Sequence, residues 1–164
     1  MVQDEFPPIN KKIEARRTAL GLSVVDVAHK VNLSIYEYGD IEYHADEIFI
    51  AVPLYHIKKL CRVLQLDYFE LFEMPCAFCE QGMPQHEDYW LHRDELAQRR
   101  RESLGLSREE LRDQVDVYDC PIELIESYTA HLESWVIINI YELADTLQIP
   151  RQVLLDVQCP RCGL

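Results

Sequence analysis

The chain repeats itself, and this repetition constrains its fold more than any other feature. At an offset of 84 residues, ALGLSVVDVAHKV (19–31) aligns with SLGLSREELRDQV (103–115). At an offset of 83, IKKLCRVLQL (57–66) aligns with IYELADTLQI (140–149), so one residue is lost between the two matches. A chain built from two copies of one segment is expected to fold as two similar halves.

Helix-start signals and apolar spacing indicate that both halves are helical. Ser107 and Glu110 have the spacing of a capping box, in which each side chain bonds a free backbone N–H at a helix start. Weaker versions occur at Ser23–Asp26 and Ser34–Glu37. Apolar residues at helical spacing are expected to face the core, namely Leu111, Val115, Ile122 and Ile125. We therefore predict an all-α chain with a first domain over 1–80, a linker over 81–88 and a second domain over 89–164.

These signals resemble the XRE type of lambda-repressor-like helix-turn-helix domains. The family's Leu-Ser, Glu-Glu-Leu, Ile-Glu and Leu-Ala-x-x-Leu motifs are matched at Leu106-Ser107, 109–111, Ile125-Glu126 and 143–147. The first half matches more loosely, at Leu22-Ser23, Ala28, Ile41-Glu42 and 60–64. The resemblance implies two tandem, degenerate helix-turn-helix repeats. It does not fix the function, because one scaffold serves many functions.

Negative charge occupies the positions where a DNA-binding member of this family reads bases. The chain carries 16 Lys and Arg against 29 Asp and Glu, a formal charge of −13 that repels phosphates. The recognition-helix positions hold Glu37, Asp40, Asp119 and Glu123 instead of base-reading Arg, Lys, Asn or Gln. We therefore predict a protein partner with a basic surface, such as a toxin, bound by an inhibitor of the antitoxin or immunity type.

The alternative is a transcription regulator that contacts DNA phosphates through basic residues. Clusters of them lie on the first helix of each half, and one more begins the second helix of the second half: Lys11, Lys12, Arg16, Arg17, Arg99, Arg100, Arg101 and Arg108. Such clusters are also typical of a solvated helix face.

Two Cys-x-x-Cys pairs are candidates for metal binding. Cys76 and Cys79 follow the last helix of the first half, and Cys159 and Cys162 follow that of the second, with 79 residues between the pairs. Four thiolates complete a tetrahedral structural Zn²⁺ site, and Gly163 suits the tight turn. We predict a zinc site that joins the two repeats, within one chain or between chains. Unliganded thiols and a redox pair are the alternatives.

The stretches 47–57 and 133–143 are more apolar than one buried helix stripe requires. The other repeat, a second copy in a homodimer, or a foreign protein is expected to cover the surplus. Tyr55 and Trp135 are the candidate anchors, because aromatic residues dominate interface energies.

Enzymatic and membrane functions have no sequence support. The chain contains no glycine-rich phosphate loop, nucleophile elbow or metal-ligand spacing among its histidines. Its N-terminus lacks the features of a signal peptide, and no apolar run reaches the length of a membrane span. We expect a non-enzymatic, cytoplasmic protein.

Overall fold

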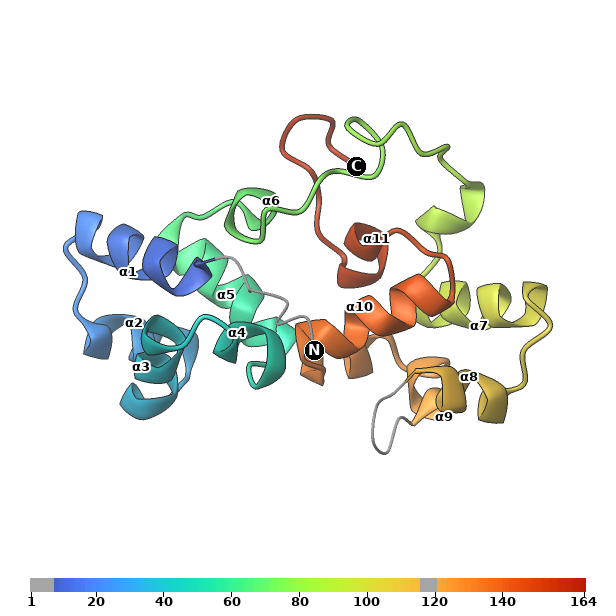
Figure 1. Ribbon diagram of the computed structural model, residues 1–164, viewed down its shortest axis with the longest axis horizontal. Helices are drawn as coiled ribbons and strands as arrows, with labels where there is room; N and C mark the ends of the chain where they lie inside the picture. Colours follow the sequence, from blue (N-terminus) through green and yellow to red (C-terminus); the bar gives the residue numbers. More distant parts are fainter. Residues whose placement is uncertain (1–7, 116–120) are drawn as a thin grey trace, which may run out of the picture. The chain divides into compact units, whose positions relative to one another are not determined.

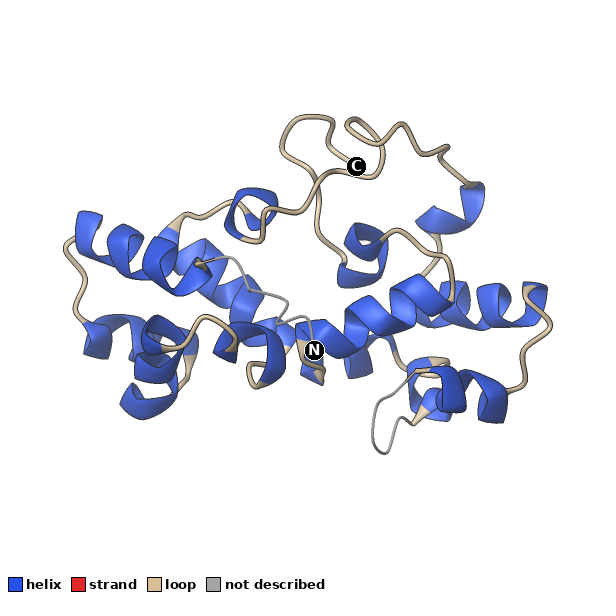
Figure 2. Cartoon of the chain, viewed as in Figure 1, coloured by secondary structure: helices blue, strands red, loops and turns tan. Residues whose placement is uncertain are grey.

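A computed structural model describes residues 8–115 and 121–164, and every regular element in them is a helix (Figure 2). The all-α prediction is therefore confirmed for this part of the chain. The fold divides into two compact units, Met1–Pro75 and Cys76–Leu164. This division places the first Cys-x-x-Cys pair in the second unit, whereas the sequence analysis assigned it to the first domain.

The first unit runs from blue to green in Figure 1. Its helices are α1 (Ile9–Ala19), α2 (Val24–Val31), α3 (Ile35–Tyr43), α4 (Glu47–Ile50), α5 (Leu54–Leu64) and α6 (Tyr68–Leu71). The closest packing joins α2 to α3 and α5, and α1 to α3. Fully buried aliphatic side chains fill the space between these helices, among them Ile13, Val27, Ile41 and Ile57.

The second unit continues to the red end of the ribbon in Figure 1. Its elements are the 3-10 helices η1 (Glu87–Trp90) and η2 (Thr129–Ser134) and the helices α7 (Arg93–Ser103), α8 (Arg108–Gln114), α9 (Ile122–Ile125), α10 (Ile137–Thr146) and α11 (Arg151–Leu155). Helix α8 packs on α9, and α10 packs on α11. The four apolar residues predicted to face inward, Leu111, Val115, Ile122 and Ile125, are all buried.

All three expected capping boxes are present in full. The hydroxyls of Ser23, Ser34 and Ser107 each accept a hydrogen bond of 3.1 Å from the backbone three residues later. The acidic partner returns a bond to the serine N–H at 2.9 Å in α2 and at 2.7 Å in α3 and α8. The two boxes that looked weaker in sequence are thus as complete as the third, because Asp26 and Glu37 both reach back to the serine N–H.

The same ion pair occurs in both units at an offset of 84. In the first unit, Arg17 of α1 donates to both carboxylate oxygens of Glu42 in α3, at 2.6 and 2.8 Å. In the second unit, Arg101 of α7 donates to both oxygens of Glu126, directly after α9. Glu126 is 1% exposed and Glu42 is 11% exposed, so each pair fixes the first helix of its unit against the third.

The second donor to this carboxylate differs between the units. The Tyr38 hydroxyl donates to Glu42 at 2.5 Å, whereas the Arg108 guanidinium donates to Glu126 at 2.7 Å. The buried carboxylate of Glu126 and the largely buried one of Glu42 therefore each receive bonds from two side chains, as a charge removed from water requires.

Candidate metal centre and partner surface

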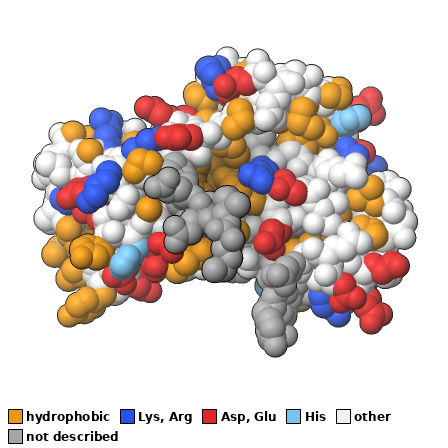
Figure 3. Space-filling model, in the orientation of Figure 1, with side chains coloured by type: hydrophobic (Ala, Val, Ile, Leu, Met, Phe, Trp, Pro, Cys, Tyr) orange, Lys and Arg blue, Asp and Glu red, His pale blue; other side chains and the backbone are white. Residues whose placement is uncertain are grey.

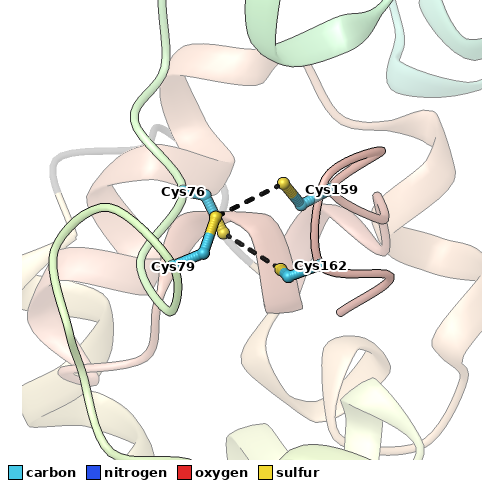
Figure 4. Close-up of side chains that lie close together, drawn as sticks. All are labelled: Cys76, Cys79, Cys159 and Cys162. Atoms are coloured by element: carbon cyan, nitrogen blue, oxygen red, sulfur yellow. Dashed lines mark hydrogen bonds between the residues drawn. The ribbon is translucent and has the colours of Figure 1, made fainter.

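The four cysteines of the two Cys-x-x-Cys pairs come together in the second unit. Cys76 and Cys79 lie on the loop before η1, Cys159 and Cys162 lie on the loop after α11, and their side chains point toward one another (Figure 4). The Sγ atoms of Cys76 and Cys162 are 3.7 Å apart, and those of Cys79 and Cys159 are 3.8 Å apart. All four sulfurs lie within 4.8 Å of one another.

This spacing fits a single metal ion bound by four thiolates. A tetrahedral ion with metal–sulfur bonds of about 2.3 Å places its sulfurs about 3.8 Å apart. Both short sulfur–sulfur distances agree with that value, and they are far longer than the roughly 2.05 Å of a disulfide. The cluster can therefore hold a metal ion.

Backbone N–H groups prepare the first sulfur of each pair for ionisation. Burial raises the pKa of Cys159, but the N–H groups of Cys162 and Arg161 outweigh it and lower that pKa to about 6. Cys76 has the same arrangement: N–H groups of Cys79 and Phe78 overcome burial and lower its pKa. Gly163 adopts φ +75°, as predicted for this turn.

The second sulfurs show why the cluster favours a cation. Loss of hydration at the sulfur and the neighbouring cysteine sulfurs raise the pKa of Cys79, although its side chain is exposed, to about 12. Adjacent thiols oppose one another's ionisation, and a positive ion between them removes that opposition.

A buried amide that the sequence analysis missed fixes both loops. The Gln152 side chain of α11 is 2% exposed. Its Oε1 accepts from the Ala77 N–H at 2.8 Å, and its Nε2 donates to the Leu164 carbonyl at 3.0 Å. One side chain thus holds a residue inside the first Cys-x-x-Cys pair and a residue just beyond the second.

An ion pair joins the same two loops on the outside. Arg161, inside the second Cys-x-x-Cys pair, donates to the Glu80 carboxylate. Glu80 also accepts from the Cys76 N–H at 2.8 Å. All four cysteines and these supporting residues belong to Cys76–Leu164, so the centre lies within one unit.

The predicted acidic partner residues differ in how free they are. Glu37 is occupied by the capping box with Ser34, and Glu123 accepts from Arg112 at 3.0 and 3.3 Å. Asp40 is exposed on α3. Asp119 lies outside the described residues.

Two tyrosines that the sequence analysis did not select flank Asp40 on the exposed face of α3. Tyr36 is 85% exposed, Tyr43 is 80% exposed, and Ile35 at the helix start is 51% exposed. Positions 36, 40 and 43 share one stripe of an α-helix. We call Ile35, Tyr36, Asp40 and Tyr43 the tyrosine surface. Figure 3 shows hydrophobic side chains gathered at the lower left of that view, over α2 and α3.

The predicted aromatic anchors have different surroundings. Tyr55 is 46% exposed on α5, whereas Trp135 is only 8% exposed, with its ring edge-on to His131 at 6.3 Å. Other side chains of the stretches 47–57 and 133–143 that exceed one buried helix stripe are also covered by side chains of their own unit. Phe49 packs edge-on against Phe72 at 5.4 Å, and the Arg151 guanidinium lies 4.3 Å over the Tyr141 ring. Trp135 is therefore not exposed as an anchor.

All eight basic residues of the DNA-binding alternative have partners within the chain. Arg17 and Arg101 are 15% and 10% exposed in their ion pairs, and Arg108 is bound to the buried Glu126. Arg16 donates to the Leu64 carbonyl at 2.9 Å. The others make more exposed contacts: Lys11 with Glu14, Lys12 with Glu73, Arg99 with Glu95, and Arg100 with Tyr89.

Comparisons with known proteins supply no family for this chain. No protein-family model matches it, and neither does any curated protein or solved structure. Across residues 8–115 and 121–164, the helices are too short or too polar to cross a lipid bilayer.

Proposed function

We propose that this protein is a non-enzymatic binding module that recognises a basic protein surface through the tyrosine surface of α3. An inhibitor of the antitoxin or immunity type is the functional class that we infer. The supporting observation is the chemistry of the α3 face, where two highly exposed tyrosines flank the acidic side chain of Asp40. Tyrosine gives a rigid contact at a small entropic penalty and attracts lysine and arginine to its ring face.

The scaffold in this proposal is a pair of degenerate XRE-like helix-turn-helix repeats. The ion pairs Arg17–Glu42 and Arg101–Glu126 support the duplication, because they recur at the same offset as the sequence match. Within the resemblance, α3 is the recognition helix. A tyrosine and aspartate face on that helix suits a basic protein better than a phosphate backbone.

The DNA-binding alternative has weaker support. Phosphate contacts require lysine or arginine side chains that are free to reach DNA. Arg17, Arg101 and Arg108 instead neutralise carboxylates between helices. Their removal from those pairs would leave Glu42 or Glu126 as an unpaired buried charge.

We further propose that the four-cysteine centre binds one structural Zn²⁺. Tetrahedral thiolate sites are typical of Zn²⁺ and of iron, and four protein ligands leave no position for a substrate. Metal analysis of protein purified without chelator should give one zinc per chain. Iron, or less than about half an equivalent of any metal, would contradict this assignment.

Partner binding can be tested with a variant confined to the tyrosine surface. Immobilised wild-type protein first captures its partner, which is then purified for titration calorimetry. Tyr36→Ala/Asp40→Asn/Tyr43→Ala should weaken binding by about 100-fold, because aromatic residues at interface centres dominate affinity. Tyr128→Ala removes another exposed tyrosine ring, 64% exposed in the second unit, and is the matched control.

Two results would contradict the proposal. The first is that the triple variant binds the purified partner as tightly as the control variant does. The second is that the wild type binds duplex DNA at about 50 mM salt and loses affinity steeply as the salt concentration rises, as phosphate contacts require.

A further inference from the structure

A pocket of about 250 Å³ lies in the second unit, beside the metal centre. Its walls come from Phe78 in the first Cys-x-x-Cys loop, from Tyr89 and Trp90 of η1, and from Val153 and Asp156 at the end of α11. This volume is below the roughly 300–1,000 Å³ of sites for drug-sized ligands. It therefore suits one side chain better than a cofactor.

Aromatic rings form much of this wall. The Phe78 and Tyr89 centroids are 5.9 Å apart with their planes at 48°, and His86 meets Tyr89 edge-on at 5.3 Å. Trp90 also lines the pocket and is 70% exposed, which is unusual for so large an apolar side chain. Aromatic faces attract cations, and tryptophan attracts them most strongly.

The charges around the pocket select the sign of its ligand. Asp156 lines it, and its described lining includes no lysine or arginine. Arg100 is not part of the described lining, but its guanidinium lies 5.6 Å from the Tyr89 centroid and donates to the Tyr89 hydroxyl at 3.4 Å. The Tyr89 ring thus already contacts one guanidinium, and the chain as a whole carries a charge of −13.

We propose that this pocket binds the guanidinium of an arginine side chain, with Trp90 and Tyr89 against its flat face and Asp156 opposite its charge. A guanidinium is planar, stacks on aromatic rings and pairs with carboxylates, whereas an ammonium group offers only a point charge. The proposal rests on the proposed function for the source of the arginine, which is the same basic partner. The pocket itself is separate from the tyrosine surface.

The pocket can be tested without the partner. N-acetyl-arginine methylamide is titrated into the full-length, metal-loaded protein, and backbone amide shifts are followed by NMR. The matched probe is N-acetyl-citrulline methylamide, which has nearly the same shape and no charge. Saturable shifts are expected within 85–91 and 152–158, with the arginine probe binding at least about fivefold more tightly than the citrulline probe.

Two variants assign the binding to its residues. Trp90→Ala removes an exposed ring, and Asp156→Asn removes the charge at a left-handed position (φ +55°) that asparagine tolerates. Each should weaken arginine binding at least about fivefold, whereas the exposed control Glu109→Gln on α8 should leave it unchanged. Equal binding of both probes, unchanged binding by both variants, or shifts that do not saturate would overturn the pocket assignment. Those results would leave the tyrosine surface, which is tested with the captured partner, unaffected.

Discussion

At the scale of single residues, Glu42 illustrates how a buried charge is held. Burial acts to raise the pKa of Glu42, but hydrogen bonds from Arg17 and Tyr38 outweigh it and hold that pKa below its ordinary value. A carboxylate with a lowered pKa stabilises the folded state fully above its unfolded pKa of about 4.3. That stabilisation is lost as the pH falls through the folded-state pKa.

Replacing Glu42 should therefore have an effect that depends on pH. We expect Glu42→Gln to lower the free energy of unfolding by about 3 kcal/mol at pH 7, because it leaves Arg17 without its counter-ion. Below about pH 4.3 the difference from wild type should shrink, since the wild-type carboxylate is then also neutralised. Urea denaturation at a series of pH values measures this. Glu14→Gln, which breaks an exposed pair, should change stability by less than about 1 kcal/mol; a pH-independent difference for Glu42→Gln would contradict the argument.

Gln152 should control the affinity of the metal centre without touching the metal. Its amide fixes the Ala77 N–H and the Leu164 carbonyl, one on each cysteine loop. Loss of such a supporting bond typically weakens metal binding by about 10- to 100-fold. Competition with a chromophoric chelator should show this loss for Gln152→Ala and not for Gln158→Ala, an exposed neighbour on the same loop. Equal affinities of the two variants would contradict a positioning role.

These residues also show what a sequence can reveal. In the sequence, Arg17 and Arg101 stand out only as members of the basic clusters on the first helix of each half. Composition does not show that acidic side chains from another helix pair with them. Their recurrence with Glu42 and Glu126 at one offset was the available signal. Gln152 gave no such signal, since its two partners are backbone groups that only the tertiary fold brings together. Tyr36 and Tyr43 lie two residues from the buried Tyr38 and Ile41, which places them on another face of the helix. This spacing was the available sign that their rings are exposed.

At the scale of elements, local chemistry determines where helices begin. The capping boxes of α2, α3 and α8 were readable because all their atoms lie within four consecutive residues. By contrast, no local sequence signal indicates that the Cys76–Cys79 loop belongs to the second unit. That loop is held by Gln152, Arg161 and Cys159, which are far away in sequence.

The cap of α3 can be tested directly. Ser34→Ala removes the hydroxyl that accepts from the Glu37 N–H at 3.1 Å. We expect a loss of about 1 kcal/mol in the free energy of unfolding, because the Glu37 N–H at the helix start then has no side-chain acceptor. Ser103→Ala, in the last turn of α7, should change stability by no more than about 0.5 kcal/mol. Denaturant titration distinguishes the two, and equal losses would show that the cap contributes nothing of its own.

At the scale of the whole molecule, both units have a core of buried apolar side chains, and the second unit also contains the four-cysteine cluster. The first unit has a core of aliphatic and aromatic residues that includes Tyr38, Phe49 and Phe69. The second unit has short helices such as α9 and α11, and long loops that meet at the four cysteines. Loops of that kind order poorly without a cross-link, and the metal ion that we propose for the four cysteines would supply one.

Metal removal should therefore loosen one unit and not the other. Hydrogen exchange followed by mass spectrometry, on the full chain with and without chelator, compares them directly. We expect faster exchange in the cysteine loops and α11 after chelation, because metal binding contributes directly to their folding free energy. Exchange in α1–α3 of the first unit should stay the same, since all four ligands lie in Cys76–Leu164. Faster exchange in both units would mean that the metal also supports the first unit, and no change in either would mean that the cysteines hold no structural metal.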